Sequence, residues 1–157
     1  METVHLSPRL ELLPRKNRKL FNHSKPDLTR GFCKIQKKGY EDEIAYENEF
    51  FIATRDSYPV TKLHTLIIPK RHFASFFDMN IDEQASVHQI LKHQRDEIVS
   101  IDPTVEAFNL GANDGVAAGQ SVFHLHIHLF PRRVGDIENP RGGVRGVIPS
   151  KQKYVKK

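Results

Sequence analysis

The sequence predicts an α+β fold, in which five short strands form an antiparallel sheet and one long helix packs on it. Three observations support this fold class. The strand candidates follow one another closely, with Asn48-Glu49 and Asp56 to Pro59 as turn signals between the first three. A single long segment has helical periodicity, and residues 124–129 of the last strand candidate alternate between histidine and apolar residues. The expected strands are residues 44–47, 50–55, 63–68, 105–110 and 122–130.

The helix is expected over residues 81–101. Its buried face follows an i, i+3, i+4 pattern, carried by Val87, Ile90, Leu91, Gln94 and Ile98. Asp78 or Asn80 can cap its N-terminus, and Asp102-Pro103 ends it because the residue before a proline disfavours helical geometry. The helix therefore separates the first three strands from the last two.

Composition excludes several classes of protein. The 157 residues suffice for one domain with a core. Apolar runs such as Leu66 to Ile68 are only a few residues long, whereas a membrane helix needs roughly 20 apolar residues. The first 20 residues have no apolar segment typical of a secretory signal. Cys33 is the only cysteine, so an internal disulfide and a four-cysteine metal site are both excluded. We expect a cytoplasmic protein.

The basic charge lies at the two ends of the chain. Residues 1–40 have a net charge of +7 and residues 132–157 of +6, while residues 41–131 have −8. Basic ends attract phosphate groups, but they lack the interleaved aromatic residues typical of nucleic-acid binding, so no nucleic-acid partner is expected. Residues 1–28 are interpreted as a basic extension, followed by one domain, 29–157, with a Gly- and Arg-rich tail.

The most informative segment is the alternation His124, His126, His128. On a strand, residues i and i+2 lie on one face, roughly 6.5 Å apart. The three imidazoles then share one face, while the apolar residues between them are buried against the helix. Three neighbouring imidazoles are costly to bury unless they are hydrogen-bonded or ligated. The pattern therefore indicates a functional site.

Two chemistries fit this segment. Histidines at i and i+2 can chelate zinc with a third ligand elsewhere. A neutral imidazole can instead attack phosphorus and form a covalent intermediate, for which His126 in the middle is best placed. The preceding loop favours the second chemistry, because its glycine N–H groups, amides and hydroxyl can donate hydrogen bonds to phosphate. The loop donors are Asn113, Gly119, Gln120 and Ser121.

At these residues the sequence resembles the histidine triad (HIT) family, whose motif alternates three histidines with apolar residues. His124 to Phe130 carries the motif, supported by the preceding Gly119 to Val122 and by Asn113. Two further segments match: Asp56 through His64 to His72, and Phe32 to Ile35. The resemblance covers about residues 29–148.

The resemblance implies a five-stranded antiparallel sheet, extended across a homodimer, and chemistry at the α-phosphate of a nucleotide. It implies that His126 is the nucleophile, that His128 contacts the phosphate and helps the leaving group, and that His124 and His64 orient the reacting ring. The expected nucleotide-binding residues, by the same resemblance, are Asp56 at the ribose, Asn113, Gly119, Gln120 and Ser121 at phosphate oxygens, and Phe32 and Ile35 at the base.

The segments 130–136 and 140–149 resemble dinucleoside polyphosphate hydrolases, so an Ap4A-type hydrolase is the expected function. A purine nucleoside phosphoramidase is the alternative, since that branch shares the triad and the loop. Some bacterial members bind structural zinc through a Cys-x-x-Cys motif. Here Arg30 stands in place of the first cysteine, so neither a metal nor another cofactor is expected. A histidine-ligated metal protein and a non-catalytic nucleotide-binding module remain as alternatives of another class.

Overall fold

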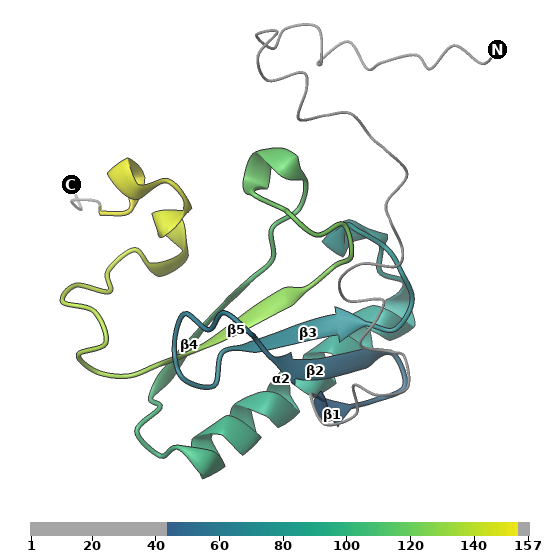
Figure 1. Cartoon of the computed structure of the whole chain (residues 1–157), viewed down its shortest axis with the longest axis horizontal. Coiled ribbons are helices and arrows are strands. Elements are labelled where there is room, and N and C mark those ends of the chain that lie inside the picture. The colour runs from purple at the N-terminus through teal and green to yellow at the C-terminus, as the bar shows by residue number, and fades with distance from the viewer. Residues whose placement is uncertain (1–43, 154–157) are drawn as a thin grey trace, which may run out of the picture.

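The computed structural model describes residues 44–153, which form one antiparallel sheet of five strands in the order β1-β2-β3-β5-β4. Figure 1 shows the helix α2 along one face of this sheet, while the loop after β4 and the C-terminal segment rise from the other side. The predicted α+β class is confirmed. The elements are β1 Ile44–Glu47, β2 Phe51–Arg55, β3 Thr65–Pro69, α2 Ile81–Ile101, β4 Ala107–Gly111 and β5 Ile127–Arg132.

The first three strands form a meander in which β2 pairs with β3 from Phe51↔Pro69 to Arg55↔Thr65. The chain then crosses through α2, and β5 inserts between β3 and β4, so that Leu66 pairs with His128 and Leu110 with Leu129. The segment 64–69 and the histidine segment are thereby neighbours, although more than 50 residues separate them in sequence. This pairing positions the candidate site.

The helix α2 has the predicted bounds, because its signals are local. Asn80 caps it: the Asn80 side chain accepts from the Glu83 N–H at 2.9 Å, and the Glu83 carboxylate accepts from the Asn80 N–H at 2.9 Å. This is a capping box, which satisfies two backbone donors that the helix itself cannot. At the other end Asp102 is the C-cap. The predicted apolar face of α2 is buried, with Ile90 and Ile98 at most 1% exposed.

The core lies between α2 and the sheet. Leu125 and Ile127 pack in one apolar cluster with Phe51, Ile67 and Ile90. Leu129 packs with Ile98 and Val105 in a second cluster. The predicted burial of the residues between the histidines is therefore confirmed.

Four of the five strand predictions are wrong in their bounds. β2 begins at Phe51 rather than at residue 50, and β3 is Thr65–Pro69 rather than 63–68. The last strand begins at Ile127 rather than Val122, and it continues through Pro131 to Arg132, beyond the expected end at residue 130. Pro131 is tolerated because the pairing of β5 with β3 ends at Leu129, so no neighbour on that side needs its missing N–H. The fourth strand is Ala107–Gly111 rather than 105–110.

The predicted extension 1–28, Phe32 and Ile35 lie outside the described residues. Within residues 44–153, no helix is both long and apolar enough to span a membrane.

Candidate active site

The histidine segment reaches the sheet only at its end. His128 is in β5, whereas His124 and His126 precede the strand. Two hydrogen bonds outside the strand ladder hold residues 124–126 beside the end of β3. His124 Nε2 lies 2.8 Å from the Pro69 carbonyl oxygen, and the Leu125 N–H donates to the Phe73 carbonyl at 2.7 Å. These hydrogen bonds replace the regular ladder of the expected strand. All four residues from His124 to Ile127 are buried, but only Leu125 and Ile127 belong to the apolar core.

His126 is held in a defined tautomer. Its Nδ1 lies 2.9 Å from the His124 carbonyl oxygen, and the ring is 7% exposed. A carbonyl oxygen can only accept, so Nδ1 carries the proton and donates. In the neutral ring the lone pair is then on Nε2. This is the arrangement that a nucleophilic imidazole requires.

His124 is held in the opposite tautomer, with its proton on Nε2, because this nitrogen also faces a carbonyl oxygen. Its Nε2 donates to the Pro69 carbonyl, so Nδ1 is the acceptor in the neutral ring, and the Nδ1 of His72 lies 3.4 Å away. Burial lowers the pKa of His124, and the nearby His72 and His126 lower it further. The sequence placed His72 only at the end of a segment that resembles the family, and this contact was not predicted, because it joins residues 52 positions apart.

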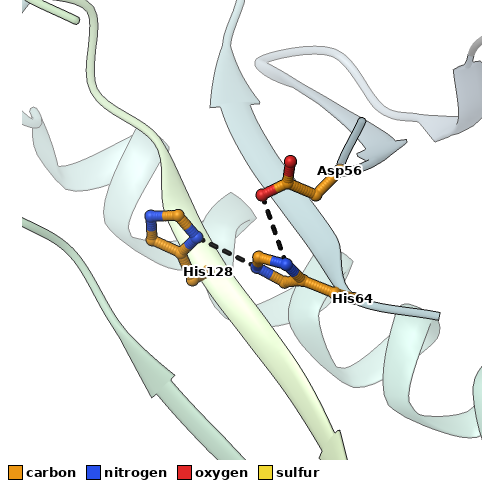
Figure 2. Close-up of side chains that lie close together, drawn as sticks. All are labelled: Asp56, His64 and His128. Atoms are coloured by element: carbon orange, nitrogen blue, oxygen red, sulfur yellow. Dashed lines mark hydrogen bonds and ion pairs between the residues drawn. The ribbon is translucent and has the colours of Figure 1, made fainter. Parts of the chain in front are cut away.

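Figure 2 shows a second arrangement on the same side of the sheet, a chain of three side chains: Asp56, His64 and His128. The Asp56 Oδ2 lies 3.2 Å from Nδ1 of His64, and the Nε2 of His64 lies 3.0 Å from Nδ1 of His128. Asp56 follows β2 and His64 precedes β3, so the turn between these strands brings the first pair together. The pairing of β3 with β5 adds His128.

The rings in this chain are neutral near pH 7. Burial lowers the pKa of His64, and Asp56 opposes this only in part. The pKa of His128 is lowered to about 4, chiefly by burial and then by the neighbouring His126 and His64. An aromatic residue also packs here. The ring centroid of Phe130 lies 4.4 Å from that of His64 and 5.3 Å from that of His128, in stacked geometry.

Phe130 was not predicted as a site residue, although its position two residues after His128 places it on the same face of β5. Its contact with His64 could not have been read from the sequence. The ring centroids of His126 and His128 lie 5.1 Å apart. His64, His126, His128 and Phe130 therefore form one continuous group of rings.

The predicted phosphate loop is anchored by buried amide contacts. Gln120 is 5% exposed; its Oε1 accepts from the Gly115 N–H at 2.8 Å, and its Nε2 donates to the Ala74 carbonyl at 2.8 Å. Gln120 thus fastens the loop to the segment after β3. Asp114 adds to this anchoring, since its Oδ2 accepts from the Ser75 hydroxyl at 2.8 Å.

The remaining loop residues differ in exposure. Asn113 is half-buried, whereas Gly119 and Ser121 are exposed. Gly119 has φ +90°, a left-handed conformation that favours glycine. Binding of phosphate by these residues stays a prediction.

Asp56, His64 and His128 also form the one group of histidine and acidic side chains, among residues 44–153, that is close enough to suggest a metal ion; one ligand atom from each lies within 4.8 Å of the others. The arrangement in Figure 2 does not converge on one point, because the two nitrogens of His64 face different partners. A zinc ion bound by all three would take one nitrogen of His64 and break one of these links. His64 Nδ1 also accepts from the Val60 N–H at 3.4 Å. The geometry fits a linear chain of contacts better than a metal centre.

Comparison with known proteins supports the family resemblance. The Bacillus subtilis protein named Protein hit is 40% identical over 106 residues, which cover 64% of this chain and 69% of that protein. The crystal structure of a hypothetical histidine triad nucleotide-binding protein from Sulfolobus tokodaii is 38% identical with a TM-score of 0.56, covering 67% of this chain and 70% of that one. An Arabidopsis thaliana adenylylsulfatase is 33% identical over 67% of this chain and 53% of its own length.

The model of the HIT domain matches residues 37–135, more than half of the chain, and includes the whole histidine segment and its partners Asp56, His64 and Phe130. Members of this family are typically nucleotide-binding hydrolases or transferases. The chain belongs to the HIT family.

Proposed function

We propose that this protein is a nucleotide hydrolase or transferase that acts at the α-phosphate of an adenine nucleotide, with a dinucleoside polyphosphate of the Ap4A type as substrate. The observation that carries the proposal is the bond from His126 Nδ1 to the His124 carbonyl oxygen. It leaves the lone pair of His126 on Nε2, and the surrounding histidines are kept neutral by burial.

In the proposed reaction, Nε2 of His126 forms a bond to the α-phosphorus while the bond from phosphorus to the leaving group breaks. Water then adds to phosphorus, and the P–N bond breaks with its electron pair returning to Nε2. His128 lies beside His126 and is placed to exchange protons with the reacting groups. We further propose that Asn113, Gly119, Gln120 and Ser121 bind phosphate oxygens, that Asp56 binds the ribose, and that Phe32 and Ile35 contact the base.

The arginines near the C-terminus bear on the choice of leaving group. Arg132 and Arg133 pair with Asp136 and Asp102, at 2.7 and 2.8 Å, so both guanidinium groups are already engaged. Arg141 is exposed in the C-terminal segment and is available to a polyphosphate, whereas Arg145 donates to the Lys151 carbonyl at 3.0 Å. Two other leaving groups fit the same nucleophile: an amine, as in a phosphoramidase, and sulfate, which the name of the Arabidopsis relative indicates for that protein.

The test is a substrate panel with a trapped intermediate. Wild-type protein should hydrolyse diadenosine polyphosphates with a higher kcat/KM than adenosine phosphoramidate or adenylyl sulfate, and quenched reactions should contain protein heavier by one nucleotidyl group. His126→Asn should lose at least about 10³-fold in kcat and form no adduct. His88→Asn, an exposed histidine on α2, is the matched control and should behave as wild type. Full activity in the His126 variant would refute the proposal.

A metal-dependent mechanism through the same histidines gives a different result. Elemental analysis would then find stoichiometric zinc, and chelation would remove both the zinc and the activity. A nucleotide-binding module without catalysis would bind the panel without turnover.

We also propose a homodimer, a cytoplasmic location and a separate basic extension over residues 1–28. The dimer is supported by the position of β4 at the edge of the sheet, where Leu110 is 51% exposed and a second β4 can pair to extend the sheet. Sedimentation equilibrium should give twice the chain mass. The location is supported by the lone Cys33.

A further inference from the structure

Leu63, the residue before His64, has an unusual backbone conformation. Its φ is +69°, and among residues 44–153 it is the one residue other than glycine with a positive φ. Leucine disfavours this left-handed region, because its Cβ comes too close to the following carbonyl oxygen. Strained residues of this kind persist only where the surrounding structure holds them, and they cluster at functional sites. Leu63 therefore needs contacts that hold it.

The peptide that joins Leu63 to His64 is held at both of its polar groups. The Leu63 carbonyl accepts from the Thr65 hydroxyl at 2.9 Å, and the His64 N–H donates to the Thr61 carbonyl at 3.0 Å. Because the peptide group is planar, these two bonds together fix its orientation and thus the direction in which the chain enters His64. The Leu63 side chain adds to this hold, since it packs on the apolar cluster that includes Ile98.

The Thr65 hydroxyl is itself oriented by a network on the α2 face of the sheet. Thr65 is fully buried and pairs with Arg55, whose Nη1 donates to the hydroxyl oxygen. The same Nη1 donates to Oε1 of the fully buried Gln94 on α2 at 2.9 Å, and Nη2 of Arg55 donates to Glu97 at 3.2 Å. A guanidinium group can only donate, so the hydroxyl accepts from Arg55 and directs its own proton to the Leu63 carbonyl.

His64 is the side chain that this arrangement places. His64 is 2% exposed, its ring stacks on Phe130 with 4.4 Å between centroids, and its Nε2 lies 3.0 Å from Nδ1 of His128. His128 in turn lies beside His126, the proposed nucleophile, with 5.1 Å between the ring centroids. A rotation of the peptide between Leu63 and His64 would therefore move a ring that packs directly in the candidate site.

We propose that Thr65 is a positioning residue that acts through the peptide between Leu63 and His64. Its hydroxyl couples the position of α2 to the ring of His64 and holds that ring against His128. Thr65 pairs with Leu129, which packs in the core under α2, so it lies on the face of the sheet opposite to His128 and touches no reacting atom. Its effect on catalysis rests on the proposed function.

The test compares two substitutions of Thr65 in the full chain. Thr65→Val keeps nearly the same shape but removes the hydroxyl, whereas Thr65→Ser keeps the hydroxyl and removes a buried methyl group. Both should lower Tm to a similar degree, because each removes one buried interaction. With diadenosine tetraphosphate as substrate, Thr65→Val should lower kcat by at least about 10-fold with little change in KM, since a misplacement of about 1 Å can cost as much as about 10²-fold. Thr65→Ser should retain the wild-type kcat.

Equal kcat values for the two variants would overturn the proposal, because the hydroxyl would then have no role beyond stability. Proton NMR gives a readout that does not depend on turnover. The NOEs between the rings of His64 and Phe130 should persist in Thr65→Ser and weaken in Thr65→Val, and unchanged NOEs in Thr65→Val would contradict the inference. If the wild-type protein hydrolyses nothing in the substrate panel, the proposed function fails, while the NMR comparison still decides whether the hydroxyl positions His64.

The left-handed conformation of Leu63 has a test of its own. Leu63→Gly and Leu63→Ala both remove the packing of the side chain, but only glycine adopts a positive φ without strain. We expect the glycine variant to have the higher Tm, which reverses the usual order of these two residues. A Tm of the alanine variant equal to or above that of the glycine variant would show that Leu63 is not held in this conformation, and would overturn the inference.

Discussion

Replacement of Glu83 by Gln tests how the fold supports the site. The Glu83 side chain is 3% exposed; it accepts from the Arg71 Nε at 2.9 Å, from an Arg71 Nη at 2.8 Å and from the Asn80 N–H at 2.9 Å. Arg71 in turn lies 4.3 Å above the Phe73 ring, and the Phe73 carbonyl accepts from Leu125 between the two first histidines. One buried carboxylate thus connects the helix start to the histidine segment.

The expected loss in the free energy of unfolding is about 3 kcal/mol. Gln has nearly the same shape, but its NH₂ faces the Arg71 donors, so the charge-assisted bonds, together worth about 1.5–3 kcal/mol, are lost. Weakening of the capping box adds about 0.5–1 kcal/mol. The two contributions add to about 2–4 kcal/mol. Because the Arg71 side chain is 53% exposed, water compensates part of the loss, and we therefore take a value near the middle of this range.

Urea denaturation followed by circular dichroism measures this loss, which should also lower Tm by roughly 10 °C. Asp82→Asn is the matched control, since it removes a carboxylate from the same helical turn that is exposed to solvent. It should cost at most about 0.5 kcal/mol through the helix dipole. The Arg71 hydrogen bonds lower the pKa of Glu83, so its contribution is present above the unfolded pKa and is lost as pH falls through the folded pKa. Equal effects of the two substitutions at pH 7 would refute this account.

Two further predictions concern the core and the histidines. Ile90→Ala should lower the free energy of unfolding by about 2–5 kcal/mol in urea denaturation, because Ile90 is 1% exposed, while Val99→Ala, 39% exposed on the same helix, should cost less than about 1 kcal/mol. Similar costs for both would mean that this face of α2 is not the buried one. The lowered pKa values of His64, His124 and His128 mean that the folded protein binds fewer protons than the unfolded chain, so stability should fall as pH drops below about 6.5 towards about 4. His128→Asn should make this decline shallower in a pH series of urea titrations; an unchanged slope would contradict burial of a neutral ring.

The sequence by itself determined the features that depend on neighbouring residues. The bounds of α2 were predicted correctly, since the Asn80 cap, the apolar periodicity and Asp102-Pro103 are all local signals. The packing of Leu125, Ile127 and Leu129 in the apolar core follows from simple alternation. His124 and His126 are buried as well, but they lie outside these apolar clusters.

Only the tertiary structure decided what each histidine contacts. The insertion of β5 between β3 and β4 places His128 against His64, 64 residues away, and Phe130 beside both. The contacts of His124 with Pro69 and His72 likewise depend on where β3 ends relative to β5. Local sequence sets which side a residue faces, but strand order and register set its partners. For an imidazole, the partner determines which nitrogen carries the proton and therefore what chemistry the ring can perform.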